Sequence, residues 1–155
     1  MNIKTRQVVK DDVQGLKDII DSSDLFPSAL LDEMMENYFN DPASTDTWLT
    51  ATYESRPIVA AYYAPEKLTD GTFNLYLIAV HKNFQGRGAG SEMMKCIEDL
   101  LRKKGERVLI VETSGSPAFA LTRKFYTDLG YQREAAIREF YQRGEDKIVF
   151  WKKLN

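Results

Sequence analysis

The sequence predicts a mixed α/β domain, and three observations lead to this prediction. The 155 residues are 43% hydrophobic and 28% charged, which is the ordinary composition of a globular protein with a buried core. Apolar residues recur with a strand period in some segments and a helical period in others, in the order β-αα-βββ-α-β-α-ββ. The run Thr72–Val80 is apolar on both faces, which is typical of a central strand.

The N-terminal half is predicted to form a strand, two helices and then three strands. Ile3–Val9 alternates between polar and apolar residues, as a short strand does. Asp11 or Asp12 can cap the first helix, and a loop follows over residues 21–28. The second helix ends before Asp41-Pro42, because the residue before a proline disfavours helical geometry. The other ranges with clear periodicity are the helix 30–38 and the strands 48–53, 57–63 and 72–80.

The C-terminal half begins with a glycine cluster, Gln85-Gly-Arg-Gly-Ala-Gly90, that runs directly into a helix. That helix is predicted to stop at Gly105, because glycine favours a helix C-terminus. Ser116-Pro117 suits the start of another helix, which ends at Gly130, since serine caps helices and proline fits the first helical position. The strand patterns of this half are 107–113, 132–140 and 148–154, with turn residues 142–146 joining the last two.

Charge and cysteine content narrow the classes of function. The chain has 21 Lys and Arg against 23 Asp and Glu, a net charge of −2, whereas a dedicated nucleic-acid binder is usually basic. The single cysteine, Cys96, permits no intrachain disulfide, and one His with one Cys does not make a usual four-ligand zinc site. No apolar run reaches the ~18 residues of a membrane span, and no signal-peptide pattern opens the chain. We therefore expect one cytoplasmic domain over residues 1–155, with no metal and no nucleic-acid or membrane partner.

The glycine cluster is the strongest functional signal in the sequence. Gly86, Gly88 and Gly90 lie where a buried strand passes into a helix, and free N–H groups at a helix start suit a phosphate or pyrophosphate. A phosphate-binding P-loop would need Lys after the last glycine, but Ser91 and Glu92 follow it. A dinucleotide-binding fingerprint that starts at Gly86 would need glycine where Ser91 stands. The alternatives are a nucleotide-binding module and a glycine-rich turn without a ligand.

The cluster resembles a signature of the GNAT superfamily of N-acetyltransferases. Gln85-x-x-Gly88-x-Gly90 is similar to the family's Gln/Arg-x-x-Gly-x-Gly/Ala motif, which binds the pyrophosphate of acetyl-CoA. The preceding strand, 75–80, and the later segment Phe125-Tyr-Thr-Asp-Leu-Gly-Tyr131 also resemble family segments, and the order of elements agrees over nearly the whole chain. The resemblance implies a central, mostly antiparallel sheet flanked by helices. It also implies direct transfer of an acetyl group from acetyl-CoA to a primary amine.

The resemblance implies a set of cofactor-binding residues. The backbone of the preceding strand should pair with the pantetheine arm as an added strand would, and the loop N–H groups should hold the pyrophosphate. Many family members carry Asn and Ala where this chain has Phe119 and Thr122, so Phe119 is expected to pack beside the pantetheine instead. The expected cofactor-binding residues are Ile78, Ala79, Val80, Gln85, Gly86, Arg87, Gly88, Ala89, Gly90, Ser91 and Phe119.

Two residues are candidates for proton transfer. Tyr126 matches the family's general acid, which protonates the departing thiolate of CoA, and a phenol of pKa ~10 suits a thiol of pKa ~8.5. The alternative interpretation of Tyr126 is a core aromatic residue on an amphipathic helix. Glu112 resembles a basic Glu of enzymes that acetylate protein N-termini, although its spacing to Tyr126 is longer than in those enzymes. A solvated carboxylate at the end of a strand is an equally good interpretation of Glu112.

The acceptor side of the site is less defined. The last hairpin usually walls the acceptor site in similar proteins, so Glu139 and Tyr141 are expected to bind the acceptor, together with Phe26. The rest of the expected wall is Leu25, Met34 and Tyr38. This mixture suits a small amine, an amino acid or a peptide N-terminus. A homodimer is expected by analogy alone, and the alternative function is a non-catalytic acyl-CoA-binding or sensing domain with the same fold.

Overall fold

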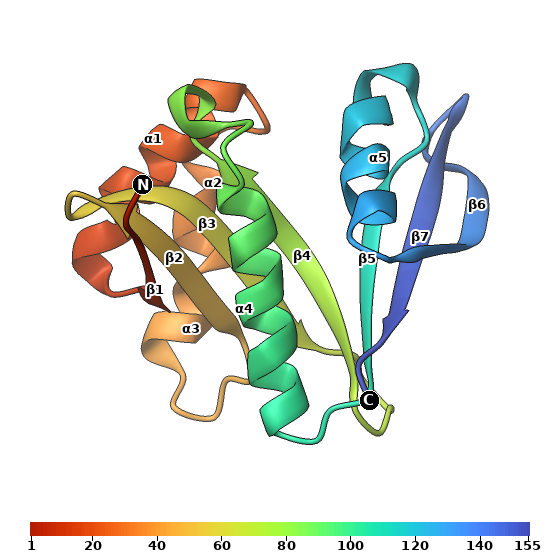
Figure 1. Ribbon diagram of the computed structural model, residues 1–155, viewed down its shortest axis with the longest axis horizontal. Helices are drawn as coiled ribbons and strands as arrows, with labels where there is room; N and C mark the ends of the chain where they lie inside the picture. Colours follow the sequence, from red (N-terminus) through yellow and green to blue (C-terminus); the bar gives the residue numbers. More distant parts are fainter. The chain divides into compact units, whose positions relative to one another are not determined.

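The strands of the computed structural model, which describes residues 1–155, form one seven-stranded sheet. The strands are β1 (Ile3–Gln7), β2 (Thr47–Tyr53), β3 (Arg56–Pro65), β4 (Thr72–Val80), β5 (Val108–Ser114), β6 (Gln132–Gln142) and β7 (Glu145–Lys153). Their order in the sheet is β1-β2-β3-β4-β5-β7-β6. β1 with β2, β2 with β3, β5 with β7 and β6 with β7 are antiparallel, whereas β4 and β5 run parallel from Thr72↔Val108 to Leu75↔Val111. The predicted mixed α/β fold with a mostly antiparallel sheet is therefore confirmed (Figure 1).

Five helices and three short turns of 3-10 helix complete the fold. The helices are α1 (Val13–Ser23), α2 (Leu30–Met34), α3 (Glu36–Asn40), α4 (Ala89–Lys103) and α5 (Ala120–Asp128). The 3-10 turns are η1 (Lys10–Asp12), η2 (Lys82–Phe84) and η3 (Pro117–Phe119).

The chain divides into two compact units. The first comprises Met1–Ala64 and Leu77–Asp99, and the second comprises Pro65–Tyr76 and Leu100–Asn155. β4 thus gives its first residues to the second unit and its last residues to the first. A single domain over residues 1–155 stays a prediction.

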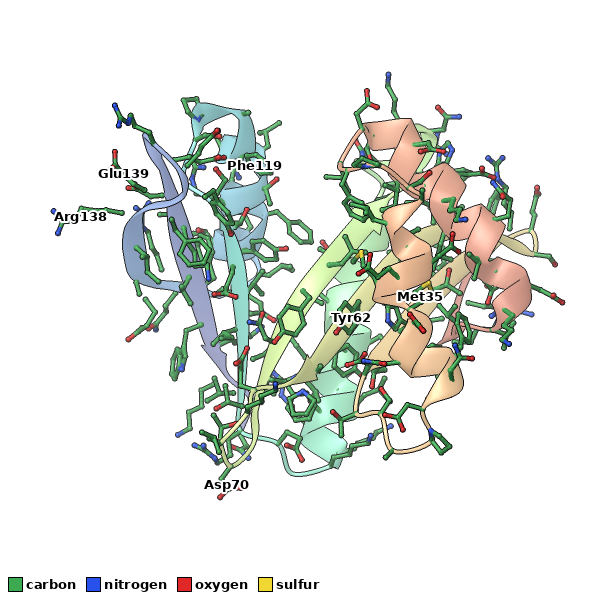
Figure 2. All side chains as sticks on the ribbon, turned by 180° about the vertical axis from the view of Figure 1, so that it is seen from behind. Met35, Tyr62, Asp70, Phe119, Arg138 and Glu139 are labelled. Atoms are coloured by element: carbon green, nitrogen blue, oxygen red, sulfur yellow. The ribbon has the colours of Figure 1, made fainter.

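The first unit is built around a core shared by helices and strands. Figures 1 and 2 show α1, α2 and α3 on one face of β1–β3 and α4 on the other. The helical repeat of α1 buries Leu16, Ile19 and Ile20 completely against Trp48 of β2. The indole of Trp48 stacks on the ring of Tyr62, with 4.6 Å between ring centroids. This aromatic pair fixes the face of the sheet that the N-terminal helices cover.

Two N-terminal details differ from the sequence-based prediction. Asp12 does not cap α1: its carboxylate accepts hydrogen bonds from Arg6 at 2.7 and 2.8 Å and from the backbone of Val9 at 2.8 Å. α1 also extends through Ser22 and Ser23 into the predicted loop, because both hydroxyls donate to the carbonyl of Ile19 inside the helix.

The predicted helix 30–38 is broken into two. The break lies at Met35, which is 1% exposed in the core and donates its N–H to Leu31 at 2.9 Å. The backbone of Met35 leaves helical geometry at φ −97° and ψ −1°, although the apolar pattern of the sequence continues through this position.

The second unit packs α5 on the sheet formed by β5, β7 and β6. β5 lies between the start of β4 and β7, and β6 is the edge strand. The register between β6 and β7 shifts twice, and Glu139 takes a left-handed backbone conformation with φ 55°. Every residue of β6 is exposed. β6 is thus an irregular edge strand rather than the regular strand 132–140 of the prediction.

Candidate active site

The glycine loop between β4 and α4 uses the backbone freedom of its glycines. Gly86 and Gly88 have φ values of +75° and +86°, which residues with a side chain rarely adopt. A Cβ atom at either position would meet nothing within 4 Å. The backbone conformation, and not crowding, therefore requires glycine here. Gly90 differs, because it lies within the first turn of α4 at an ordinary φ.

The start of α4 presents backbone N–H groups that can bind an anion. The N–H of Glu92 donates to the carbonyl of Gly88 at 3.0 Å, so the N–H groups of Ala89, Gly90 and Ser91 precede the first full helical bond. Partial positive charge at a helix N-terminus adds to this attraction. The loop thus offers an anion such as a phosphate backbone N–H groups rather than a basic surface.

The loop is attached to the first unit by hydrogen bonds at its base. The N–H of His81 donates to Ile58 at 2.8 Å, and the N–H of Lys82 donates to the hydroxyl of Ser22 at 3.0 Å. His81 Nδ1 accepts from the N–H of Asn83, which makes His81 a structural cap. Gln85 Nε2 donates a hydrogen bond of 3.1 Å to the carbonyl of Val80. These bonds hold the loop at the end of β4 whose backbone is the expected pantetheine partner.

Tyr126 lies in an aromatic cluster on α5. Its side chain is 3% exposed, and its ring contacts Phe125, Tyr131 and Phe150 at centroid distances of 5.2, 6.0 and 5.6 Å. Burial raises the pKa of the phenol well above its ordinary value. Tyr126 is therefore a buried core residue, and its phenol is a weaker acid than the sequence-based match with a thiol assumed.

Glu112 is held by two partners in the second unit. Its Oε2 atom lies 2.6 Å from Nζ of Lys147, and its Oε1 atom accepts a hydrogen bond of 3.0 Å from Asn74 Nδ2. Burial favours the neutral acid, but the bonds from Lys147 and Asn74 outweigh it and hold the pKa of Glu112 below its ordinary value. Glu112 is thus a paired carboxylate and not the solvated strand end of the alternative interpretation.

The same amide connects a second carboxylate to this group. Asn74 is 2% exposed, and its Nδ2 also donates to Oε1 of Glu66 at 2.8 Å. The hydroxyl of Tyr76 donates to that oxygen at 3.0 Å. The residues Glu66, Asn74, Tyr76, Glu112 and Lys147 are called the amide cluster below.

The two hairpin residues expected at the acceptor site differ in their surroundings. Tyr141 is 45% exposed, and partial burial together with the negative charges of Glu112 and Glu145 raises its pKa. Glu139 instead closes its own hairpin: its carboxylate accepts from Gly144 N–H at 3.2 Å, and its N–H donates to Asp146 at 3.0 Å. Figure 2 shows Glu139 on the outer side of this hairpin.

The remaining predicted residues have mainly structural contacts. Phe119 is half-buried at the start of α5 (Figure 2), where its N–H donates to Ser116. Phe26, Met34 and Tyr38 pack against the core of the first unit, and the hydroxyl of Tyr38 donates to Val8 at 2.7 Å. Their contacts with a cofactor or an acceptor stay predictions.

Sequence reasoning missed Asn74, Lys147 and Glu66. Asn74 carries a usable signal, because it is a polar residue inside the apolar run Phe73–Val80. Lys147 and Glu66 carry none, since charged residues are common beside strands and turns. Two general findings complete the description: no group of His, Cys, Asp or Glu is arranged to hold a metal ion, and no helix is long and apolar enough to cross a membrane.

Comparison with known proteins identifies the family. The sequence model of the acetyltransferase (GNAT) family matches residues 16–131. An uncharacterized N-acetyltransferase of Methanocaldococcus jannaschii, MJ1530, is 30% identical over 86 residues, which are 54% of this chain and 53% of that protein. The chain thus spans about half the length of this curated relative.

Solved structures share the whole fold. A crystal structure described as a GNAT-family acetyltransferase from Desulfovibrio desulfuricans has a TM-score of 0.93 and 29% identity, covering 99% of this chain and all of that one. The yncA protein of Salmonella typhimurium, described as an acetyltransferase with its cofactor acetyl-CoA, has a TM-score of 0.78 and 17% identity over 99% of this chain and 94% of its own. With the family match over most of the sequence, the conclusion is direct: this chain belongs to the GNAT family of acetyltransferases.

Proposed function

We propose that this protein transfers an acetyl group from acetyl-CoA directly to a primary amine of a small molecule, an amino acid or a peptide. The observation that carries the proposal is the glycine loop, in which Gly86 and Gly88 adopt positive φ values immediately before the N-terminus of α4. The Salmonella structure with acetyl-CoA supports the choice of acyl donor. A cytoplasmic location, a single domain over residues 1–155 and a homodimer are parts of the same proposal.

The residues of the first unit would hold the donor. Backbone N–H groups from Gly86 to Ser91 bind the pyrophosphate, and Arg87 adds a positive charge, with its guanidinium carbon 5.7 Å from the ring centroid of Phe84. The backbone of Ile78–Val80 pairs with the pantetheine arm. When bound, acetyl-CoA supplies the acetyl group as a thioester.

Residues of the second unit would move protons. An amine must be neutral to attack a carbonyl carbon. Glu112 would accept the proton that the ammonium loses, and release of its bond to Lys147, which holds its pKa low, would make it a better base. Tyr126 keeps its proton at neutral pH and donates it from its hydroxyl to the leaving sulfur. Tyr141 lies near Glu112 and would contact the acceptor.

A thiol-release screen tests this function. Acetyl-CoA is incubated with the protein and with alkylamines, amino acids or short peptides, and free CoA thiol is measured against a reaction without acceptor. We expect at least one acceptor class to release thiol in proportion to protein concentration. CoA binding by calorimetry without thiol release from any amine would instead support the non-catalytic binding domain. ATP or NAD binding that CoA does not displace would support a nucleotide-binding module.

A further inference from the structure

Lys147 places its ammonium group between a carboxylate and an aromatic ring. Its Nζ atom lies 2.6 Å from Oε2 of Glu112 and 3.6 Å from the centroid of the Phe140 ring. The side chain of Lys147 is 12% exposed. A carboxylate combined with an aromatic face is a common way for proteins to recognise an ammonium ion.

We propose that Glu112 and Phe140 form a receptor for a primary alkylammonium group, which Lys147 fills in the resting protein and the acceptor amine takes during turnover. The turnover part rests on the proposed acetyl transfer, whereas the receptor itself does not. On binding, the acceptor replaces the chain's own ammonium at Glu112. One N–H bond of the acceptor then breaks and an O–H bond forms on Glu112, which leaves the neutral amine.

A buried acceptor atom beside Glu112 supports a second ligand group there. Asn74 donates from Nδ2 to Glu112, and its Oδ1 atom is buried without a hydrogen-bond partner. An unpaired buried acceptor costs free energy, on the order of 1–3 kcal/mol in proteins. The ammonium of Lys147 bonds to Glu112 and leaves this atom without a partner. A free ammonium with three N–H donors can serve the carboxylate and the amide oxygen together.

The charges around the receptor favour a cation. Glu66 shares the amide of Asn74 with Glu112, and Glu145 lies close enough to act with Glu112 on Tyr141. Glu145 also accepts a hydrogen bond of 2.6 Å from Ser114. The three carboxylates select a protonated aliphatic amine over a neutral aromatic amine, since only the former carries a charge at neutral pH.

The variant Lys147→Ala tests the receptor by chemical replacement. It removes the group –CH2–CH2–CH2–NH3⁺, which n-propylammonium reproduces atom for atom. We expect n-propylammonium chloride, at several times its dissociation constant, to raise the Tm of Lys147→Ala by about 2–4 °C. n-Propanol, which has the same length without the charge, should not raise it. The wild-type protein should show a smaller rise at the same concentration, because n-propylammonium must displace Lys147 from Glu112.

Two control variants separate a receptor from a general salt effect. Lys124→Ala removes a lysine from an exposed ion pair with Asp128 at 2.6 Å, and n-propylammonium should leave its Tm unchanged. The double variant Lys147→Ala with Glu112→Gln should lose the response of the single variant. An equal response of Lys147→Ala and Lys124→Ala, or no response of either, would overturn the receptor.

Kinetics provide a second readout. Lys147→Ala should lower the KM for the acceptor amine about fivefold, since the acceptor no longer displaces an ion pair, while Lys147→Arg should stay near the wild-type KM. If Lys147→Ala does not fold, the wild-type protein provides the test. n-Propylammonium should inhibit it competitively against the acceptor. No inhibition at an n-propylammonium concentration about 100-fold above that of the acceptor would overturn the proposal. A protein that binds n-propylammonium in the Tm assay but transfers no acetyl group would refute the proposed function and leave the receptor standing.

Discussion

Asn74 donates a hydrogen bond of 3.0 Å from its Nδ2 atom to Oε1 of Glu112, which joins β4 to β5 through side chains. The same nitrogen donates to Glu66 at 2.8 Å. One buried amide therefore satisfies two carboxylates that would otherwise repel each other. The amide cluster depends on this neutral donor, and changes of charge at position 74 test that dependence.

The variant Asn74→Asp should destabilise the protein by about 2–4 kcal/mol at pH 7, because it replaces two donated hydrogen bonds with a buried negative charge beside two carboxylates. Urea unfolding at pH 7 and pH 5 measures the loss, which should shrink at the lower pH as a proton restores a donor. Asn37→Asp adds the same charge at an exposed position of α3 and should change the free energy of unfolding little. Equal losses in the two variants would refute the role of the amide.

The variant Tyr126→Phe should lower kcat on a working acceptor about 100-fold, because it removes the proton donor and keeps the ring. The dissociation constant for acetyl-CoA and the Tm should stay near wild type, since the contacts with Phe125, Tyr131 and Phe150 are made by the ring. Thiol release and calorimetry give the two quantities separately. Tyr131→Phe, in the same aromatic cluster, is the matched control and should retain kcat. Unchanged turnover in Tyr126→Phe would mean that Tyr126 is a core residue alone.

The variant Gly88→Ala should weaken acetyl-CoA binding about tenfold by shifting the backbone away from φ +86°. Gly105→Ala provides the same kind of strain elsewhere, since Gly105 has φ +77° and also meets nothing within 4 Å. Both variants should lose about 1 kcal/mol of stability. Only Gly88→Ala should change the affinity measured by calorimetry. A similar loss of affinity in both would show that general destabilisation, and not loop geometry, is responsible.

The contribution of Glu112 to stability should depend on pH in one direction. Its pKa is lower in the folded protein than the ordinary value of about 4.3, so the folded state binds its proton less readily than the unfolded state does. The stabilisation is therefore fully present above the unfolded pKa and is lost as the pH falls through the folded pKa. The Tm difference between wild type and Glu112→Gln should be largest near neutral pH and smallest at strongly acidic pH. A difference that grows on acidification would contradict the assigned direction.

The sequence correctly predicts the elements that are defined by a local residue pattern. β4 is apolar on both faces and lies centrally in the sheet, and the helix after the glycine loop starts at Ala89. The end of α1 was missed because Ser22 and Ser23 are typical turn residues, yet both hydroxyls bond within the helix. The break at the buried Met35 was also missed, because the apolar residues keep their helical spacing across it.

The candidate site also has one part that the sequence predicts and one part that it does not. The glycine loop could be predicted because its conformation depends on residues adjacent in the chain. The pairing of Glu112 with Lys147 could not, because it depends on the register in which β5 meets β7, with Ser114 opposite Lys147. The role of Asn74 likewise depends on two carboxylates from separate segments. Contacts that cross strands require the register, and a single sequence does not contain it.

The glycine loop has a consequence for how this protein can diverge. Because Gly86 and Gly88 act through torsion angles and backbone N–H groups, a change of the side chain at Arg87 alters only an added charge and leaves the main phosphate-binding groups in place. Inherited variation can alter the neighbours Arg87 and Ala89 while the two torsions persist. Substitutions in the C-terminal hairpin could therefore change the preferred acceptor step by step. Replacement of Gly86 or Gly88 would instead disrupt the loop conformation at once.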